Sequence, residues 1–189
     1  MNVDMEIETC IEVLKKGGVI LYPTDTVWGL GCDATNASAV QKIKEIKKRV
    51  ENKSMIVLVN HINMLSKYVD VIPTAAVDIL EYASKPTTIV FDKMMGVAEN
   101  VVAADGSCGV RITADEFCNK LIRKFNKPIV STSANISGEK TPRNFKEIDK
   151  TLAPLCDYVV QFKSGETTLG VPSSIIKLQN NGLVTIIRK

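Results

Sequence analysis

The sequence predicts an α/β or α+β fold built on a mixed sheet. Early in the chain, short apolar runs typical of buried strands alternate with apolar residues at helical spacing. Later in the chain the strand-like runs cluster, and Asn180-Asn181-Gly182 separates the last two. That tripeptide is typical of a turn between antiparallel strands. Because such a hairpin is antiparallel, the sheet cannot be entirely parallel.

Helices are predicted where apolar residues recur every three or four positions. The first such segment closes with Lys15-Lys16-Gly17-Gly18, and glycine is a common helix stop. In the second, Val40, Ile43 and Ile46 lie on one stripe. On these grounds we predict helices over residues 5–16, 37–49, 62–69, 74–83, 117–125 and 145–152.

Strands are predicted for short runs of β-branched and other apolar residues bounded by turn signals. Pro23 ends the first of these runs, because proline removes a backbone donor. Residues 94–109 show no regular pattern, and we expect a loop there. The predicted strands cover residues 19–22, 55–59, 88–91, 109–112, 129–132, 158–162, 174–178 and 183–187.

Size and composition predict one domain over residues 1–189, since 45% hydrophobic residues suffice for one core. The five cysteines are odd in number and form no C-x-x-C, and the chain has one histidine, so neither a disulfide framework nor structural zinc is expected. Reduced thiols, an acidic N-terminus and the lack of a ~20-residue apolar run predict a soluble cytoplasmic protein with no membrane association.

Common catalytic and nucleotide-binding motifs fit poorly. Residues 29–34 match G-x-G-x-x-A, but they do not follow directly on a strand as a dinucleotide site requires. We expect these glycines to allow a tight turn or a close approach. Residues 138–141 resemble a phosphate-binding loop, but Glu139 replaces the required glycine. His61 is the only candidate histidine base, and a solvated or capping role is favoured for it.

Polar residues of one chemical kind gather at the ends of apolar runs. Hydroxyls, amides, Lys and Arg dominate, and paired carboxylates are nearly absent. This inventory favours binding an anionic, phosphate-bearing substrate over cleavage by a protein nucleophile. Trp28 is expected in the core, and Lys42 and Lys44 on a solvated helix face. The polar stretches are residues 22–31, 47–49, 109–111, 131–135 and 170–174.

These same stretches resemble the motifs of the YrdC family over nearly the whole chain. Residues 22–31 read Y-P-T-D-T-V-W-G-L-G, the most distinctive match, and residues 47–49 resemble the family's K-x-R. Residues 133–135 resemble its S-x-N and residues 109–111 its G-V-R. Residues 170–176, which read G-V-P-S-S-I-I, resemble its G-x-x-S-T-[IV]-[IV]. The resemblance implies a twisted mixed sheet flanked by helices around a deep, positively lined cavity.

The resemblance also implies a reaction. A short-form threonylcarbamoyl-AMP synthase converts L-threonine, bicarbonate or CO2, and ATP into threonylcarbamoyl-AMP and pyrophosphate. Mg²⁺ is expected with ATP, and partner proteins would use the product to modify a tRNA adenosine. No protein nucleophile is needed, which agrees with the missing histidine base.

Site residues follow from the resemblance position by position. L-Threonine is assigned to Thr26, Arg111, Ser131 and Ser173. The nucleotide is assigned to Arg49, Lys53, Ser107, Ser133, Asn135, Thr141 and Arg188. Lys47 and Arg49 are the implied catalytic pair, and no side chain is implied as a metal ligand.

The sequence departs from the family pattern near the predicted threonine subsite, and other functions stay open. Residues 84–88 keep only the second proline and the threonine of P-G-P-x-T, and Thr113 stands where the family has proline. The alternative is a non-enzymatic protein that binds double-stranded RNA or tRNA, although a net charge of +3 favours a local pocket over a broad RNA surface. A carbamoyl-handling relative in hydrogenase maturation ranks last.

Overall fold

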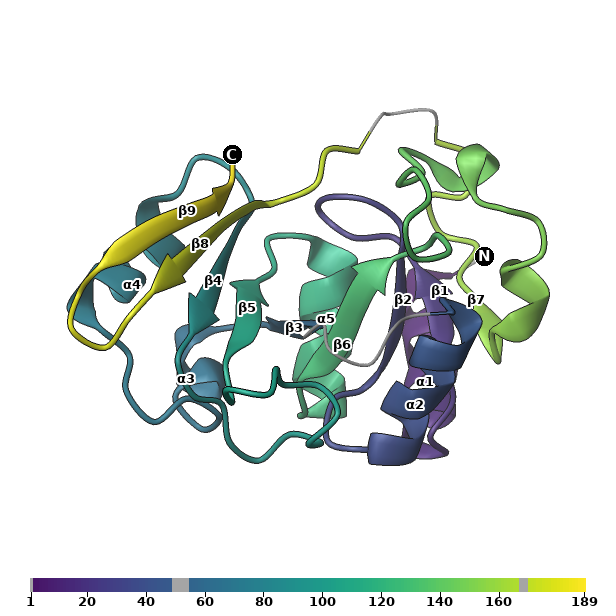
Figure 1. The fold of residues 1–189 in the computed structure, drawn as a ribbon. Helices are drawn as coiled ribbons and strands as arrows, with labels where there is room; N and C mark the ends of the chain where they lie inside the picture. The colour runs from purple at the N-terminus through teal and green to yellow at the C-terminus, as the bar shows by residue number, and fades with distance from the viewer. Residues whose placement is uncertain (1, 49–54, 167–169) are drawn as a thin grey trace.

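One mixed sheet organises the chain in the computed structural model, which describes residues 2–48, 55–166 and 170–189 (Figure 1). Its strands are β1 (Ile20–Tyr22), β2 (Gly29–Asp33), β3 (Ile56–Val59), β4 (Thr87–Phe91), β5 (Cys108–Ile112), β6 (Ile129–Ser133), β7 (Tyr158–Val159), β8 (Ser174–Leu178) and β9 (Val184–Arg188). Their order across the sheet is β7-β1-β2-β6-β3-β5-β4-β8-β9. Arg49 and Lys53, both with predicted roles, lie outside the described residues.

The sheet contains parallel and antiparallel pairs, as the sequence predicts. Strand β1 runs parallel to β7, β3 to β5, and β4 to β8. The other neighbouring pairs are antiparallel, including the β8–β9 hairpin at the sheet edge. The predicted α/β fold with a mixed sheet is therefore confirmed.

Helices pack against this sheet, and several begin at a capping side chain. They are α1 (Val3–Lys15), α2 (Ala37–Ile46), α3 (Ile62–Leu65), α4 (Thr74–Tyr82) and α5 (Glu116–Phe125). Asn36 caps α2 and Asp115 caps α5, each by accepting a backbone N–H. His61 caps α3 through Nδ1, which confirms the capping role expected of it. Helix α1 packs on α5, α2 contacts β2, and α5 contacts β3.

Strand β2 is the main element that the sequence did not predict. The sequence predicts a turn or a close approach over residues 29–34, because glycine allows both. The structure has an extended strand, and the turn is wrong. The close approach is correct: a Cβ on Gly31 would lie 2.6 Å from Cε1 of Tyr22. Gly31 therefore leaves room for the Tyr22 ring on the neighbouring strand.

The helix predicted over residues 145–152 is wrong. Two short 3₁₀ turns, η1 (Phe145–Glu147) and η2 (Ala153–Leu155), stand in that region. Between them Asp149 accepts hydrogen bonds from the backbone N–H and the hydroxyl of Thr151. Such local side-chain bonds compete with helical ones. The apolar residues do recur at helical spacing, but they pack into the protein from turns and not from a helix.

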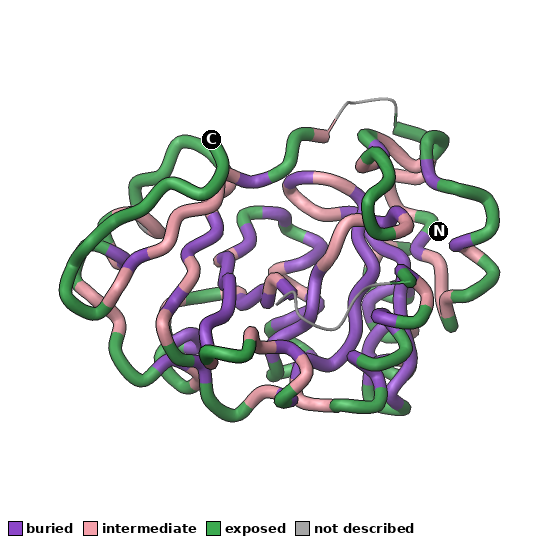
Figure 2. The backbone as a smooth tube through the Cα atoms, viewed as in Figure 1, coloured by how far each residue is buried: buried purple, intermediate pink, exposed green. Residues whose placement is uncertain are grey.

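The core lies along the central strands, whereas β9, the outer strand of the terminal hairpin, is exposed and β8 is half-buried (Figure 2). Trp28 is buried and its ring centroid lies 4.8 Å from that of Phe145, which confirms the expected core position. The irregular segment before β5 is tied down by backbone bonds such as that from Ala98 N–H to the Ala34 carbonyl. No helix within the described ranges has the length and apolar character needed to cross a membrane.

Candidate active site

A cavity of about 700 Å³ lies between the middle of the sheet and the β8–β9 hairpin. The strand register builds one wall of it, because it pairs Ser131 with Ile56, Ile56 with Gly109, and Gly109 with Val90. These residues come from β6, β3, β5 and β4, and all line the cavity. Paired residues face the same side of a sheet, so distant sequence segments meet on one surface.

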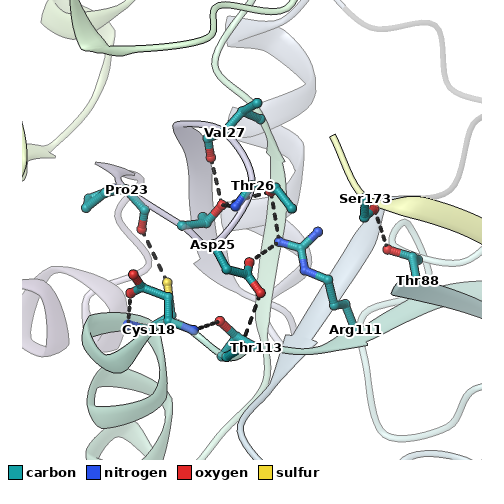
Figure 3. Close-up of polar contacts among 12 residues, drawn as sticks. Pro23, Asp25, Thr26, Val27, Thr88, Arg111, Thr113, Cys118 and Ser173 are labelled. Atoms are coloured by element: carbon teal, nitrogen blue, oxygen red, sulfur yellow. Dashed lines mark hydrogen bonds and ion pairs between the residues drawn. The ribbon is translucent and has the colours of Figure 1, made fainter. Parts of the chain in front are cut away.

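Arg111 enters the cavity from β5 and is 4% exposed. Its Nη2 lies 3.0 Å from Oδ1 of Asp25, whose side chain is 9% exposed. The same nitrogen donates to Oγ1 of Thr26 at 3.2 Å. Figure 3 shows the guanidinium between Asp25 and Thr26 on one side and the Thr88–Ser173 pair on the other. A buried cation is therefore held by its own counter-charge and kept at the cavity wall.

Ser173 links two further parts of the cavity. Its hydroxyl lies 2.8 Å from that of Thr88 on β4, and both residues are buried. Arg188 of β9 donates from Nε to the Ser173 carbonyl at 2.9 Å, and its Nη2 lies 3.4 Å from the Ser173 hydroxyl. A serine on the predicted threonine side therefore contacts an arginine on the predicted nucleotide side.

A β-bulge in β9 turns Arg188 toward the cavity. Ile186 pairs with Ile176, but Arg188 pairs with Ile175, which leaves Ile187 as an extra residue. In a regular strand neighbouring side chains face opposite sides. Here Ile187 and Arg188 both line the cavity. If the same residues paired without the bulge, Ile187 would lie opposite Ile175 and Arg188 would face the other side of the hairpin.

The charge of the cavity is positive. Arg111 and Arg188 are the charged residues that line it in the described part of the chain. Partial burial lowers the pKa of Arg188, and the positive charge of Arg111 lowers it further. Because guanidinium groups stay protonated in proteins, the two cations repel each other without titrating. An anionic ligand between them would relieve this repulsion.

Behind the cavity wall lie neutral side chains that burial keeps protonated. Tyr22 and Cys118 lie near Arg111, and burial raises the pKa of both well above ordinary values. The Cys118 thiol donates to the Pro23 carbonyl. A buried thiol with a raised pKa is a poor nucleophile. These residues therefore pack the site and supply no reactive anion at neutral pH.

The segment that leads into β8 crosses directly over the Thr26 loop. Gly170 N–H donates to the Arg143 carbonyl at 2.7 Å. Beyond it, Pro172 and Ser173 line the cavity. A side chain at Gly170 would collide with the Thr26 backbone, so glycine allows the two segments to touch.

The structure brings together most residues with predicted binding roles. Those that line the one cavity are Thr26, Arg111, Ser131, Ser133, Thr141, Ser173 and Arg188. They come from sequence positions more than a hundred residues apart at the extremes, yet share a single surface. Ligand contacts for them stay predictions.

Three other predicted residues lie behind the cavity wall. Lys47 is 2% exposed, and its Nζ donates to the carbonyls of Ser133 and Asn135, the latter at 2.6 Å. Asn135 donates from Nδ2 to the carbonyls of Ile136 and Glu139. These bonds hold the loop after β6 in place. Buried Ser107 accepts at its carbonyl from Ala103, which does line the cavity.

Sequence reasoning assigned no role to Asp25 or Thr88, although both belong to the site by contact. Asp25 pairs with Arg111, and Thr88 pairs with Ser173. A signal for Thr88 existed in the strand periodicity, because Thr88 and Val90 face one side of β4 and both line the cavity. Nothing local indicates the partner of Asp25, which lies 86 positions away.

The fold and site define a class: an α/β protein with a cationic, hydroxyl-lined cavity that suits an anionic ligand. A model of the Sua5/YciO/YrdC family, described as "Telomere recombination", matches residues 12–189. The chain therefore belongs to the Sua5/YciO/YrdC family.

Relatives at full length carry one activity in their names. A protein of Xanthomonas euvesicatoria pv. vesicatoria, named threonylcarbamoyl-AMP synthase, is 33% identical over 93% of this chain and 94% of its own. One of Methanocaldococcus jannaschii, named a putative threonylcarbamoyl-AMP synthase, is 34% identical over 96% of this chain and 86% of its own.

Among solved structures, P. abyssi Sua5 complexed with L-threonine superimposes with a TM-score of 0.81 at 29% identity. The match covers 91% of this chain and 50% of the Sua5 chain, so the chain spans half the length of that relative.

Proposed function

We propose that the chain is an L-threonylcarbamoyladenylate synthase. It would condense L-threonine, bicarbonate or CO2, and ATP into threonylcarbamoyl-AMP and pyrophosphate. The observation that carries this proposal is the meeting of Arg111 and Arg188 in one cavity walled by Thr and Ser hydroxyls. Threonine as substrate is supported by the Sua5 structure with L-threonine, and the activity by the names of the full-length relatives.

For this reaction the protein must align the carbamate with ATP and supply positive charge near their negative groups. The neutral amine of threonine attacks the carbon of CO2 and releases a proton to water, and an oxygen of the resulting carbamate anion attacks the α-phosphorus of ATP. A new P–O bond forms as the bond to the β-phosphate oxygen breaks, and pyrophosphate leaves. Holding both anions together removes an entropic barrier, and fixed cations stabilise the charge that develops.

Roles then divide along the cavity. Arg111, Thr26, Ser131 and Ser173 would hold the amino acid, and Ser133, Thr141 and Arg188 the nucleotide. Lys47 and Asn135 would act on the nucleotide indirectly, because their hydrogen bonds hold the end of β6, where Ser133 lies, and the loop that follows it. Arg49 and Lys53 keep their proposed nucleotide roles from the family motif.

We propose that Mg²⁺ enters with ATP. In the described residues no group of three His, Cys, Asp or Glu side chains is placed to hold a metal. Phosphate oxygens would therefore supply most of its ligands, which is typical of Mg²⁺ in nucleotide sites. The ion would neutralise charge on the leaving pyrophosphate. The product would pass to cytoplasmic partner proteins that modify tRNA.

Pyrophosphate release tests the proposal directly. The protein is incubated with ATP, Mg²⁺ and bicarbonate, with and without L-threonine. We expect release that requires both threonine and bicarbonate. Pyrophosphate release that is the same with and without threonine, or no release at all, would overturn the synthase assignment. Tight, salt-dependent binding of double-stranded RNA by an inactive protein would support the RNA-binding alternative.

A further inference from the structure

The guanidinium of Arg111 is held at one nitrogen and left with spare donors elsewhere. Nη2 forms an ion pair with Oδ1 of Asp25 at 3.0 Å and donates a hydrogen bond to Oγ1 of Thr26 at 3.2 Å. Nε is buried and has no hydrogen-bond partner among the described residues. In Figure 3 the terminal nitrogen that carries no dashed line, Nη1, points away from Asp25, on the side of Ser173. Nη1 is therefore the donor that a ligand in the cavity could reach, whereas Nε is enclosed by the protein.

The Asp25 carboxylate is held in place by the backbone as well as by the arginine. Its Oδ2 accepts from the backbone N–H of Ala114 at 3.2 Å, just before α5, and its Oδ1 contacts Arg111. Asp25 does not line the main cavity, whereas Arg111 does. The carboxylate therefore approaches the guanidinium from behind and competes for none of the space that a ligand would fill.

Thr24 fixes the second contact by setting the direction of a hydroxyl. The Thr24 hydroxyl donates to the Val27 carbonyl at 2.7 Å, so its own hydrogen is used. The Thr24 and Thr26 hydroxyl oxygens lie 2.9 Å apart, and Thr26 must then be the donor of this bond. The Thr26 oxygen is left as an acceptor toward Arg111, which is the role its contact with Nη2 requires.

We propose that Asp25 and Thr24 are positioning residues that hold the Nη2 side of Arg111, so that Nη1 faces the cavity and receives the carboxylate of the amino-acid substrate. The inference rests on the proposed function and adds to it how the substrate carboxylate is recognised. A guanidinium on a flexible stem loses affinity to rotamer disorder, and prior fixation removes that cost. Neither residue is required to touch the substrate.

Asp115 provides a matched control within the same chain. It is also a buried aspartate that accepts a backbone N–H, from Cys118 at 2.9 Å, and contacts a cation, Lys163 Nζ at 2.8 Å. It does not line the main cavity. Asp115→Asn therefore removes the same kind of ion pair without touching Arg111.

The test compares binding of L-threonine and L-threoninol, which lacks the carboxylate, by titration calorimetry. For Asp25→Asn we expect threonine affinity to fall about ten-fold or more, the scale of one charge-assisted hydrogen bond, with threoninol affinity nearly unchanged. Thr24→Val, which keeps the ion pair, should give a smaller loss in the same direction. Asp115→Asn should leave the preference for threonine intact while it lowers the melting temperature.

The outcomes separate the possibilities. Equal losses for both ligands, or no loss in Asp25→Asn, would overturn the positioning role. If Asp25→Asn does not fold, an unchanged threonine preference in Thr24→Val would overturn it as well. If the wild-type chain binds no threonine, the proposed function fails and this inference with it.

Discussion

Gly170 lies against the main chain of Thr26 so closely that a Cβ on Gly170 would fall 2.0 Å from the Thr26 carbonyl oxygen. Real Cβ atoms do not approach backbone oxygens to this distance, so one of the two segments would have to move. Both segments carry cavity residues, Thr26 itself on one and Ser173 on the other. Packing at one glycine therefore fixes the relative position of two walls of the site.

Gly170→Ala is expected to destabilise the protein by about 1–3 kcal/mol, the usual cost of overpacking. It should also weaken threonine binding, since Thr26 and Ser173 move apart. Urea unfolding and calorimetry would measure the two effects. Gly165→Ala is the control, because a Cβ there meets nothing within 4 Å. Wild-type stability in Gly170→Ala would show that the close approach is not maintained in solution.

Arg188→Gln is expected to raise the KM for ATP about ten-fold or more, with a smaller effect on threonine. The change removes a fixed positive charge and its charge-assisted hydrogen bonds, which are stronger than neutral ones. Pyrophosphate release at varied ATP would measure it. Lys189→Gln makes the same change in net charge at the next residue and should have little effect. Equal responses in the two variants would mean that charge acts only at long range.

Lys47→Met is expected to lower the free energy of unfolding by about 1–3 kcal/mol, because it leaves the carbonyls of Ser133 and Asn135 without this donor. Chemical denaturation would measure the loss. Lys42→Met is the control on the same helix, where one carbonyl, that of Gly17, loses its donor. Should Lys47→Met keep full stability and lose activity, Lys47 acts in the chemistry and not as a brace.

Stability should fall at alkaline pH through the buried thiols. Burial raises the pKa of Cys108 to about 12 from its ordinary value of 9.0. The folded state therefore favours the neutral thiol, and its contribution is complete below pH 9 and lost as pH rises toward 12. The loss is about 1.4 kcal/mol per pH unit for each such group. Urea unfolding at pH 7.5, 9 and 10.5 would measure this slope, which should be shallower in Cys108→Ala.

Much of the fold could be predicted because burial imposes periodicity on the sequence. The strand predicted over residues 174–178 has the same bounds as β8, and the helical stripe ending at Phe125 forms α5. Strand β2 could not be predicted because its glycines give no side-chain pattern. Gly31 is needed there because it leaves room for the Tyr22 ring on the paired strand β1. The helix prediction over residues 145–152 was wrong although its side-chain pattern is clear. Apolar residues recur there at helical spacing, but they pack from short turns.

The site could be predicted as a set of residues but not as an arrangement. Residue type and position at strand ends indicated Arg111, Ser131 and Ser133, and the structure brings them to one cavity. The direction of a side chain depends on its tertiary neighbours, so the turn of Lys47 toward two carbonyls could not be foreseen. The pairing of Asp25 with Arg111 is likewise a property of the folded sheet.

The bulge at Ile187 has a consequence for how such chains should be aligned. A chain of the same length that paired this strand without the bulge would place its isoleucine opposite Ile175 and send the arginine to the opposite surface. The presence of the bulge in this edge strand, together with residue type, thus decides whether a positive charge faces the binding site. Loss of the bulge at constant strand length would therefore act like a charge-removing substitution, whereas deletion of the extra residue Ile187 would keep the arginine opposite Ile175.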